Sequence, residues 1–182
     1  MGEQNKFANE ENVFTTLGVT NSWISNIDSK ISFMLAFLAV LSGFILNNGL
    51  PQAYNSIKSL SSISEISGSQ IISAILVTSL YILLFLSIFK FLNALTAKVD
   101  GDSSNSNQAS IFFFGSIGNK TLTTYTDEYL AITDEEAMKQ VLEQVHTNSK
   151  ICTKKVKDYN DGMRFSKFVT AIWFLCSVFQ LL

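Results

Sequence analysis

Charge is scarce in this chain of 182 residues. Asp, Glu, Lys and Arg together make up 15% of it, against about a quarter in a usual soluble domain. The net charge is −2, and the sequence has no basic stripe interleaved with aromatic residues, which a nucleic-acid-binding surface would need. The composition therefore points away from soluble domains in general and from nucleic-acid-binding proteins in particular.

Cysteine and histidine, which often act as nucleophiles, general bases or metal ligands, are also rare. The two cysteines, Cys152 and Cys176, and the single histidine, His146, are not spaced as metal ligands. The sequence has no HExxH motif, and the glycines of Gly115–Gly118 lack the lysine of a phosphate-binding P-loop. We therefore predict that the chain is not an enzyme and has no metal and no resident cofactor.

Apolar residues are abundant, at 47% of the chain, and they gather in three long runs. The runs are Ile31–Leu46, Ile71–Leu95 and Phe165–Leu182. A helix over the middle run, whose only charge is Lys90, would exceed the ~30 Å hydrocarbon core of a bilayer. One such run could be a buried helix of a soluble protein, but three favour an all-α membrane protein with three transmembrane helices. We place these helices at residues 31–46, 71–95 and 166–182.

The distribution of lysine predicts the orientation. Residues 96–165 carry most of the basic side chains, whereas the loop at residues 47–70 carries one. The positive-inside rule then places residues 96–165 and the N-terminal residues 1–30 in the cytosol, and the loop outside. Lys90 and Lys167, at the ends of spans, are expected to snorkel toward the cytosolic interface.

The N-terminal segment is predicted to be disordered over residues 1–12 and helical from there into the first span. Its apolar residues recur at helical spacing, at Val13, Leu17, Trp23 or Ile24, Ile27 and Ile31. Asp28 and Lys30 are two positions apart, so on a helix they face different partners. Asn47 to Pro51 are expected to end this helix, and residues 52–70 to hold a short helix on the membrane surface.

Residues 96–165 begin with a polar linker, which is followed by an aromatic run, Phe112 to Phe114, and then Gly115. The run is compatible with a buried strand that ends in a turn, with an interfacial anchor, or with a stacking platform for a base. Gly115 is a candidate for a backbone conformation that residues with a Cβ atom disfavour.

A long helix is predicted after this run. Thr133 and Glu136 have the spacing of a capping box, in which each side chain bonds the backbone of the other. Near-heptad positions then predict a packing seam. They are Met138, Val141 or Leu142, Val145, Ser149, Cys152, Val156, Tyr159 and Met163. The seam would hold a second copy of the chain, giving a homo-oligomer, or the chain's own N-terminal helix.

Two stretches resemble the membrane-embedded effectors of Pycsar, a bacterial antiphage system. NIDSKISFMLAFLAVLSGFIL is similar to the family's first span, which opens with Asp-x-Lys, although Ile27 stands where the family usually has Ala. IFFFGSI…TYTDEYL is similar to its cytosolic Phe-Phe-Gly element and the acidic helix start that follows. The resemblance covers the chain from Trp23 to its C-terminus. The ligand-binding or coupling candidates that the resemblance implies are Asp28, Lys30, Phe113, Phe114, Gly115 and Tyr129.

The resemblance implies a function. On infection a partner cyclase would make a cyclic pyrimidine mononucleotide, cyclic CMP or cyclic UMP, which residues 96–165 would sense. The effector would then impair the bacterial inner membrane, so that the infected cell stops growing or dies before phage are released. Membrane lipid, the nucleotide and further copies of the chain would be its partners. The residues alone leave two alternatives open: a holin-like membrane-lesion protein and a non-lytic membrane scaffold.

Overall fold

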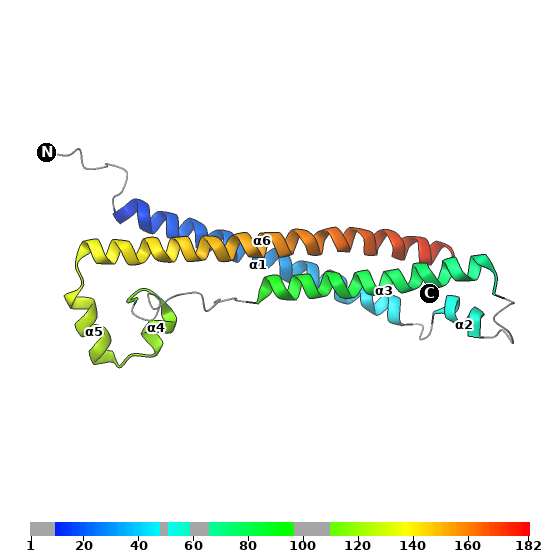
Figure 1. Cartoon of the computed structure of the whole chain (residues 1–182), viewed down its shortest axis with the longest axis horizontal. Helices are drawn as coiled ribbons and strands as arrows, with labels where there is room; N and C mark the ends of the chain where they lie inside the picture. The colour runs from blue at the N-terminus through cyan, green and yellow to red at the C-terminus, as the bar shows by residue number, and fades with distance from the viewer. Residues whose placement is uncertain (1–9, 48–50, 59–65, 97–109) are drawn as a thin grey trace. The chain divides into compact units, whose positions relative to one another are not determined.

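The computed structural model describes residues 10–47, 51–58, 66–96 and 110–182, and within these ranges all regular secondary structure is α-helical (Figure 1). The helices are α1 (Glu10–Leu46), α2 (Gln52–Lys58), α3 (Gly68–Leu95), α4 (Phe114–Gly118), α5 (Leu122–Ala131) and α6 (Asp134–Val178). The predicted all-α class is confirmed. The disorder predicted over residues 1–12 is wrong for residues 10–12, which form the first turn of α1. Residues 1–9 and the predicted linker at residues 97–109 lie outside the described residues.

The described residues fall into two compact units. The first unit draws on Met1–Asn26 and Ala97–Lys154, and the second on Ile27–Thr96 and Lys155–Leu182. Two helices, α1 and α6, contribute to both units without a helical break. Each of these two helices therefore lies partly in the first unit and partly in the second.

The helix predicted to run from the N-terminal segment into the first span is α1. Its buried apolar positions recur at intervals of three, four or seven residues and include Ile27, Ile31, Leu38, Leu41 and Ile45. Ile24 is half-buried and Trp23 is 59% exposed, so Ile24 is the residue that continues the buried stripe.

The second unit exposes large apolar side chains. Both α1 and α3 are long and apolar enough to cross a membrane, and only 22% of the apolar window in each is buried. A core helix of a soluble protein would be mostly buried instead. The outward-facing side chains include Phe33, Phe44, Ile72, Ile75 and Phe85. Exposed large apolar side chains in this number indicate contact with a membrane or with other protein.

Two of the three predicted spans lie in α1 and α3, which pass this test. The third predicted span lies in α6, which does not pass it. The helix ends at Val178, about four turns after Arg164, and its apolar end contains Lys167. It is thus shorter than the ~20 apolar residues of a usual span. Several large apolar side chains in this part are nevertheless exposed, as in α3: Phe168, Phe174, Leu175 and Val178.

The C-terminus reaches the short helix α2, which accounts for part of the helix predicted over residues 52–70. The backbone N–H of Ala53 donates to the carbonyl of Leu181 at 3.2 Å. The hydroxyls of Tyr54 and Thr78 are 2.8 Å apart, so α2 lies against α3 well inside its length. The C-terminus and the α1–α3 connection therefore meet at the same end of the second unit.

The buried face of α6 is displaced by about one position from the predicted seam. Of the predicted residues, Val141 is buried, but Ser149 and Val156 are exposed. Buried positions recur at multiples of seven residues, at Val141, Lys155, Gly162, Val169 and Cys176, and Asn148 between the first two is half-buried. A polar residue and a glycine occupy core positions of this repeat, so an apolar pattern does not identify them.

In the first unit the predicted capping box begins α6. The backbone N–H of Glu136 donates to the Thr133 hydroxyl, and the N–H of Thr133 donates to the Glu136 carboxylate, both at 3.3 Å. The aromatic run is not a strand: residues 111–113 are irregular, and Phe114 begins the short helix α4. A hydroxyl from Thr121 caps α5 in the same way, at 3.2 Å from the Thr124 nitrogen.

Candidate functional site

A hollow of about 290 Å³ in the first unit is lined by four separate segments. They are the start of α1, residues 111–112, the end of α5 and the first turns of α6. The lining side chains that define this aromatic hollow are Phe14, Phe112, Tyr129, Asp134, Met138 and Val141. Segments far apart in the sequence thus place three aromatic rings around one space.

The segment that carries Phe112 is held in place by its backbone. The N–H of Ile111 donates to the Gln140 side-chain oxygen of α6 at 2.9 Å, and the N–H of Phe112 donates to the Ser110 hydroxyl at 3.2 Å. Ser110 and Ile111 are both buried. This anchoring sets the Phe112 ring edge-on to Phe14, with centroids 6.2 Å apart and planes at 73°.

Two of the rings remain open to solvent. Phe14 is 50% exposed and Tyr129 is 52% exposed, and Tyr129 also contacts Tyr125, with ring centroids 6.0 Å apart. Exposed aromatic faces around a hollow can stack a flat ring of a ligand. Among the lining residues that the structure describes, Asp134 is the one with a charged side chain. The hollow is thus suited to a neutral ring that donates a hydrogen bond, and poorly suited to a phosphate.

The residues predicted as candidates in the first unit separate into two groups. Tyr129 lines the aromatic hollow, whereas Phe113 caps the N-terminus of α4 and Gly115 lies in its first turn, outside the lining. Phe114 begins α4, and its side chain lies outside the described part of the structure. Phe14 was missed, because nothing in a helical sequence near the N-terminus signals that it meets a segment so far along the chain.

Gly115 is constrained by a neighbour rather than by its backbone. Its φ angle is not in the left-handed region, so the conformational restriction expected for it is wrong. A Cβ atom at this position would instead lie 2.7 Å from Cε1 of Phe113. The glycine therefore leaves room for the Phe113 ring.

Asp28 and Lys30 have different surroundings in the second unit, as predicted. The ammonium group of Lys155 donates to the Asp28 carboxylate at 2.6 Å and lies 3.5 Å from the carbonyl of Leu95. The Lys155 side chain is only 7% exposed, whereas Lys30 is exposed. One buried ammonium thus joins α1, α6 and the end of α3.

Lys90 forms ion pairs with α6. Its ammonium lies 3.0 Å from carboxylate oxygens of both Asp158 and Asp161. The Lys90 side chain is 30% exposed. Snorkelling by Lys90 and by the exposed Lys167 stays a prediction.

Small and polar residues form the contact between α3 and α6 one turn further along. The hydroxyls of Ser87 and Ser166 are 2.7 Å apart, and Ser87 also donates to the carbonyl of Gly162 at 3.1 Å. A Cβ atom on Gly162 would lie 3.0 Å from the ring of Phe91, which is fully buried. Gly162 therefore permits the close approach of the two helices.

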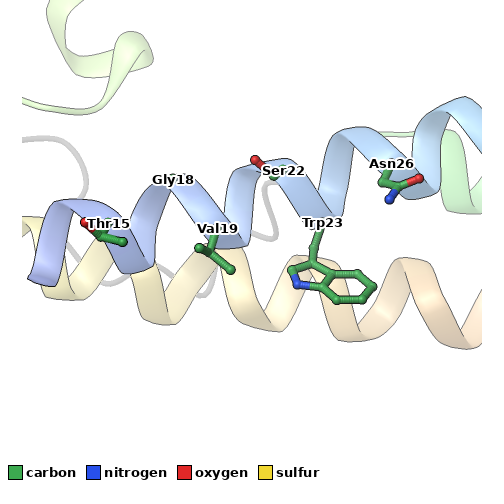
Figure 2. Close-up of a pocket in the computed structure, with 6 residues that line it drawn as sticks. All are labelled: Thr15, Gly18, Val19, Ser22, Trp23 and Asn26. Atoms are coloured by element: carbon green, nitrogen blue, oxygen red, sulfur yellow. The ribbon is translucent and has the colours of Figure 1, made fainter.

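A second, more open hollow of about 390 Å³ lies along α1 in the first unit (Figure 2). Its lining comes from one face of this single helix: Thr15, Gly18, Val19, Ser22, Trp23 and Asn26. Figure 2 shows Val19 and Trp23 on the same side of the helix. With one aromatic ring and no charged side chain in its lining, this face is less suited to a specific polar ligand than the aromatic hollow.

Among the described residues, no group of three or more His, Cys, Asp or Glu side chains could hold a metal ion. The ion pairs and hydroxyl hydrogen bonds described above join helices of the second unit, and the aromatic hollow is the candidate binding site.

Comparisons with known proteins agree with the resemblance seen in the sequence. The family model described as Pycsar effector protein domain, PycTM, matches residues 12–182. The Pycsar effector protein GmPycTM of Gulbenkiania mobilis is 32% identical over 180 residues, and the match covers 91% of each chain. No solved structure matches the chain. The family match spans both structural units, including the aromatic hollow and the buried polar contacts. This chain therefore belongs to the Pycsar effector family.

Proposed function

We propose that this chain is the membrane effector of an antiphage system. A cyclic pyrimidine mononucleotide from a partner cyclase activates it, and it then impairs the inner membrane and stops the infected cell. Membership of the Pycsar effector family carries the proposal. The apolar surface of the second unit supports it, because a membrane-impairing protein must hold such a surface in lipid.

In this proposal three segments cross the membrane: the apolar part of α1, α3 and the end of α6. Lys90 contacts Asp158 at one end of the second unit, and Leu181 contacts Ala53 at the other. The end of α6 thus runs from the charged end of α3 to the α1–α3 connection. Because α2 meets the C-terminus against α3, α6 need not be as long as α3 to complete the crossing. The lysine distribution then places the first unit in the cytosol.

Activation requires that the nucleotide bind one arrangement of the chain better than another. The first unit would bind the nucleotide, and α1 and α6 would transmit the change because they continue unbroken into the second unit. Within the second unit, the Asp28–Lys155 and Lys90–Asp158 pairs are the polar contacts that a rearranged or oligomeric state would exchange. Association of several copies would turn the exchange into a membrane lesion.

A voltage-sensitive dye in bacterial cells tests the proposal. The chain would be expressed alone, with its cognate cyclase, and with a catalytically inactive cyclase. Depolarisation is expected only with the active cyclase, and only after infection or nucleotide production. Equal depolarisation in all three strains would favour a holin-like protein. A normal potential in all three, despite normal protein abundance and cyclic nucleotide, would favour a scaffold.

A further inference from the structure

We propose that the aromatic hollow binds the pyrimidine base of the activating nucleotide, and that Asp134 accepts a hydrogen bond from the edge of that base. The inference rests on the proposed function, since it locates the ligand of the same response. Both the shape and the charge of the hollow carry it.

The size of the hollow suits a mononucleotide. At about 290 Å³ it lies near the lower end of the ~300–1,000 Å³ of usual small-molecule sites. A base with part of its sugar would fill it.

The walls supply stacking. Phe112 is fixed by the backbone bonds of residues 111 and 112, and its ring meets Phe14 edge-on. Tyr129 adds a ring from α5, and half of its surface is exposed. Any base has a π-face that stacks on such rings, so the aromatic walls provide affinity without choosing between cytosine and uracil.

The carboxylate of Asp134 supplies a hydrogen-bond acceptor for the edge of the base. Cytosine presents an exocyclic amino group and uracil presents its ring N3–H, and each of these groups donates to a carboxylate. The phosphate would be repelled by the same carboxylate. The bound nucleotide therefore has its base inside the hollow and its phosphate toward solvent.

The experiment measures equilibrium binding of cyclic CMP and cyclic UMP by isothermal titration calorimetry. The sample is the full chain in lipid nanodiscs. Tyr129→Ala removes a wall of the hollow, and Asp134→Asn keeps the shape of the side chain but adds a donor beside its acceptor. Two matched controls change the same unit outside the hollow. Trp23→Ala removes a 59% exposed aromatic ring from the face shown in Figure 2, and Glu135→Gln neutralises the next carboxylate along α6.

The unaltered chain is expected to bind a cyclic pyrimidine nucleotide. Tyr129→Ala should weaken binding by about fivefold to a hundredfold, the range of base–aromatic stacking. Asp134→Asn should weaken binding by about fivefold, because a neutral amide oxygen is a weaker hydrogen-bond acceptor than a carboxylate. Both controls should bind like the unaltered chain.

If the unaltered chain binds neither nucleotide, both the proposed function and the inference are overturned. If it binds one of them and Tyr129→Ala binds equally well, the site lies elsewhere and the proposed function survives. Unchanged binding by Asp134→Asn would overturn the role of Asp134.

Discussion

Lys155 is the side chain whose environment is hardest to explain without a function or a partner. A lysine with 7% of its side chain exposed loses most of its hydration, and the loss is tolerable only when an opposite charge and further acceptors replace the water. Asp28 and the carbonyl of Leu95 are those acceptors. The Asp-x-Lys pattern identifies Asp28 from the sequence, but its partner lies 127 positions away and gives no local signal.

Asp28→Asn is expected to leave the buried ammonium without a counter-charge. The cost should be about 3 kcal/mol in the free energy of unfolding, the lower end for a broken buried pair, because the Asp28 side chain is 35% exposed. Thermal unfolding in detergent measures it. The double variant Asp28→Asn with Lys155→Met should regain part of the loss, since no charge is then left buried.

Lys30→Gln is the matched control, because Lys30 is exposed two positions along the same helix. It should change stability by less than about 0.5 kcal/mol. An equal loss for Lys30→Gln and Asp28→Asn would contradict the assigned pair.

Gly115→Ala tests the second residue-scale constraint. An added Cβ atom would meet the Phe113 ring at 2.7 Å, and the displacement of a packed ring costs about 1–3 kcal/mol. Gly118→Ala is the control in the same short helix, because nothing lies within 4 Å of its Cβ position. Phage protection and membrane protein level would be measured for both variants. We expect Gly115→Ala to lower one or both and Gly118→Ala to leave them unchanged, and equal behaviour would refute the contact.

Among the helices, the sequence predicts the features that depend on neighbouring residues along the chain, namely where a helix runs and where it begins. Apolar spacing predicts α1 as one helix through Asp28 and Lys30, and the Thr133–Glu136 box predicts where α6 begins. The end of α3 at Leu95 also agrees with its apolar run. These features depend on neighbours within one or two turns.

The remaining features depend on residues brought together from a distance. The core of α6 includes Lys155, Gly162 and Ser166, which have no place in a hydrophobic seam unless their partners on α1 and α3 are known. The aromatic hollow is equally hidden, because Phe14 and Phe112 become neighbours only after folding. Of the site, the sequence therefore predicts Tyr129 and the aromatic run, but not the hollow.

Gly162→Ala tests the contact between α3 and α6. In an open helix the exchange would stabilise the chain by about 1 kcal/mol, whereas here the Cβ atom would press on Phe91 at 3.0 Å. We expect Gly162→Ala to have a lower unfolding temperature in detergent than the unaltered chain. If this contact holds the resting state, the variant should also depolarise the membrane at a lower level of cyclase activity than the unaltered chain needs. Gly43→Ala, with nothing within 4 Å of the added atom, should not destabilise. A stabilised Gly162→Ala variant would show that the helices are not in close contact there.

At the scale of the whole molecule, three crossing segments distinguish this account from a two-span protein. Single cysteines would be introduced into a chain with Cys152→Ala and Cys176→Ala, and then labelled with a membrane-impermeant reagent from outside. Ser61→Cys and Gln180→Cys should be modified, and Asn105→Cys should be protected until the membrane is opened. Protection of Gln180→Cys with labelling of Ser61→Cys would leave α6 on the inner side, and the reverse pattern at Ser61 and Asn105 would overturn the orientation.

The two structural units have different features. The first unit holds the aromatic hollow, and the second unit holds the apolar surface and the buried polar pairs. Because α1 and α6 belong to both units, a change in the first unit can alter the second without a separate linker. The central claim is that a cyclic pyrimidine nucleotide, and no other component, drives the second unit to impair a membrane.

The membrane potential of sealed liposomes that contain the purified chain tests this dependence on the nucleotide. A potassium gradient with valinomycin would set a membrane potential, which a voltage-sensitive dye follows while cyclic CMP, cyclic UMP or cyclic AMP is added. We predict that the potential is stable without nucleotide and collapses on addition of a cyclic pyrimidine nucleotide but not of cyclic AMP. A potential that is lost before any nucleotide is added, or that stays intact with all three, would contradict it.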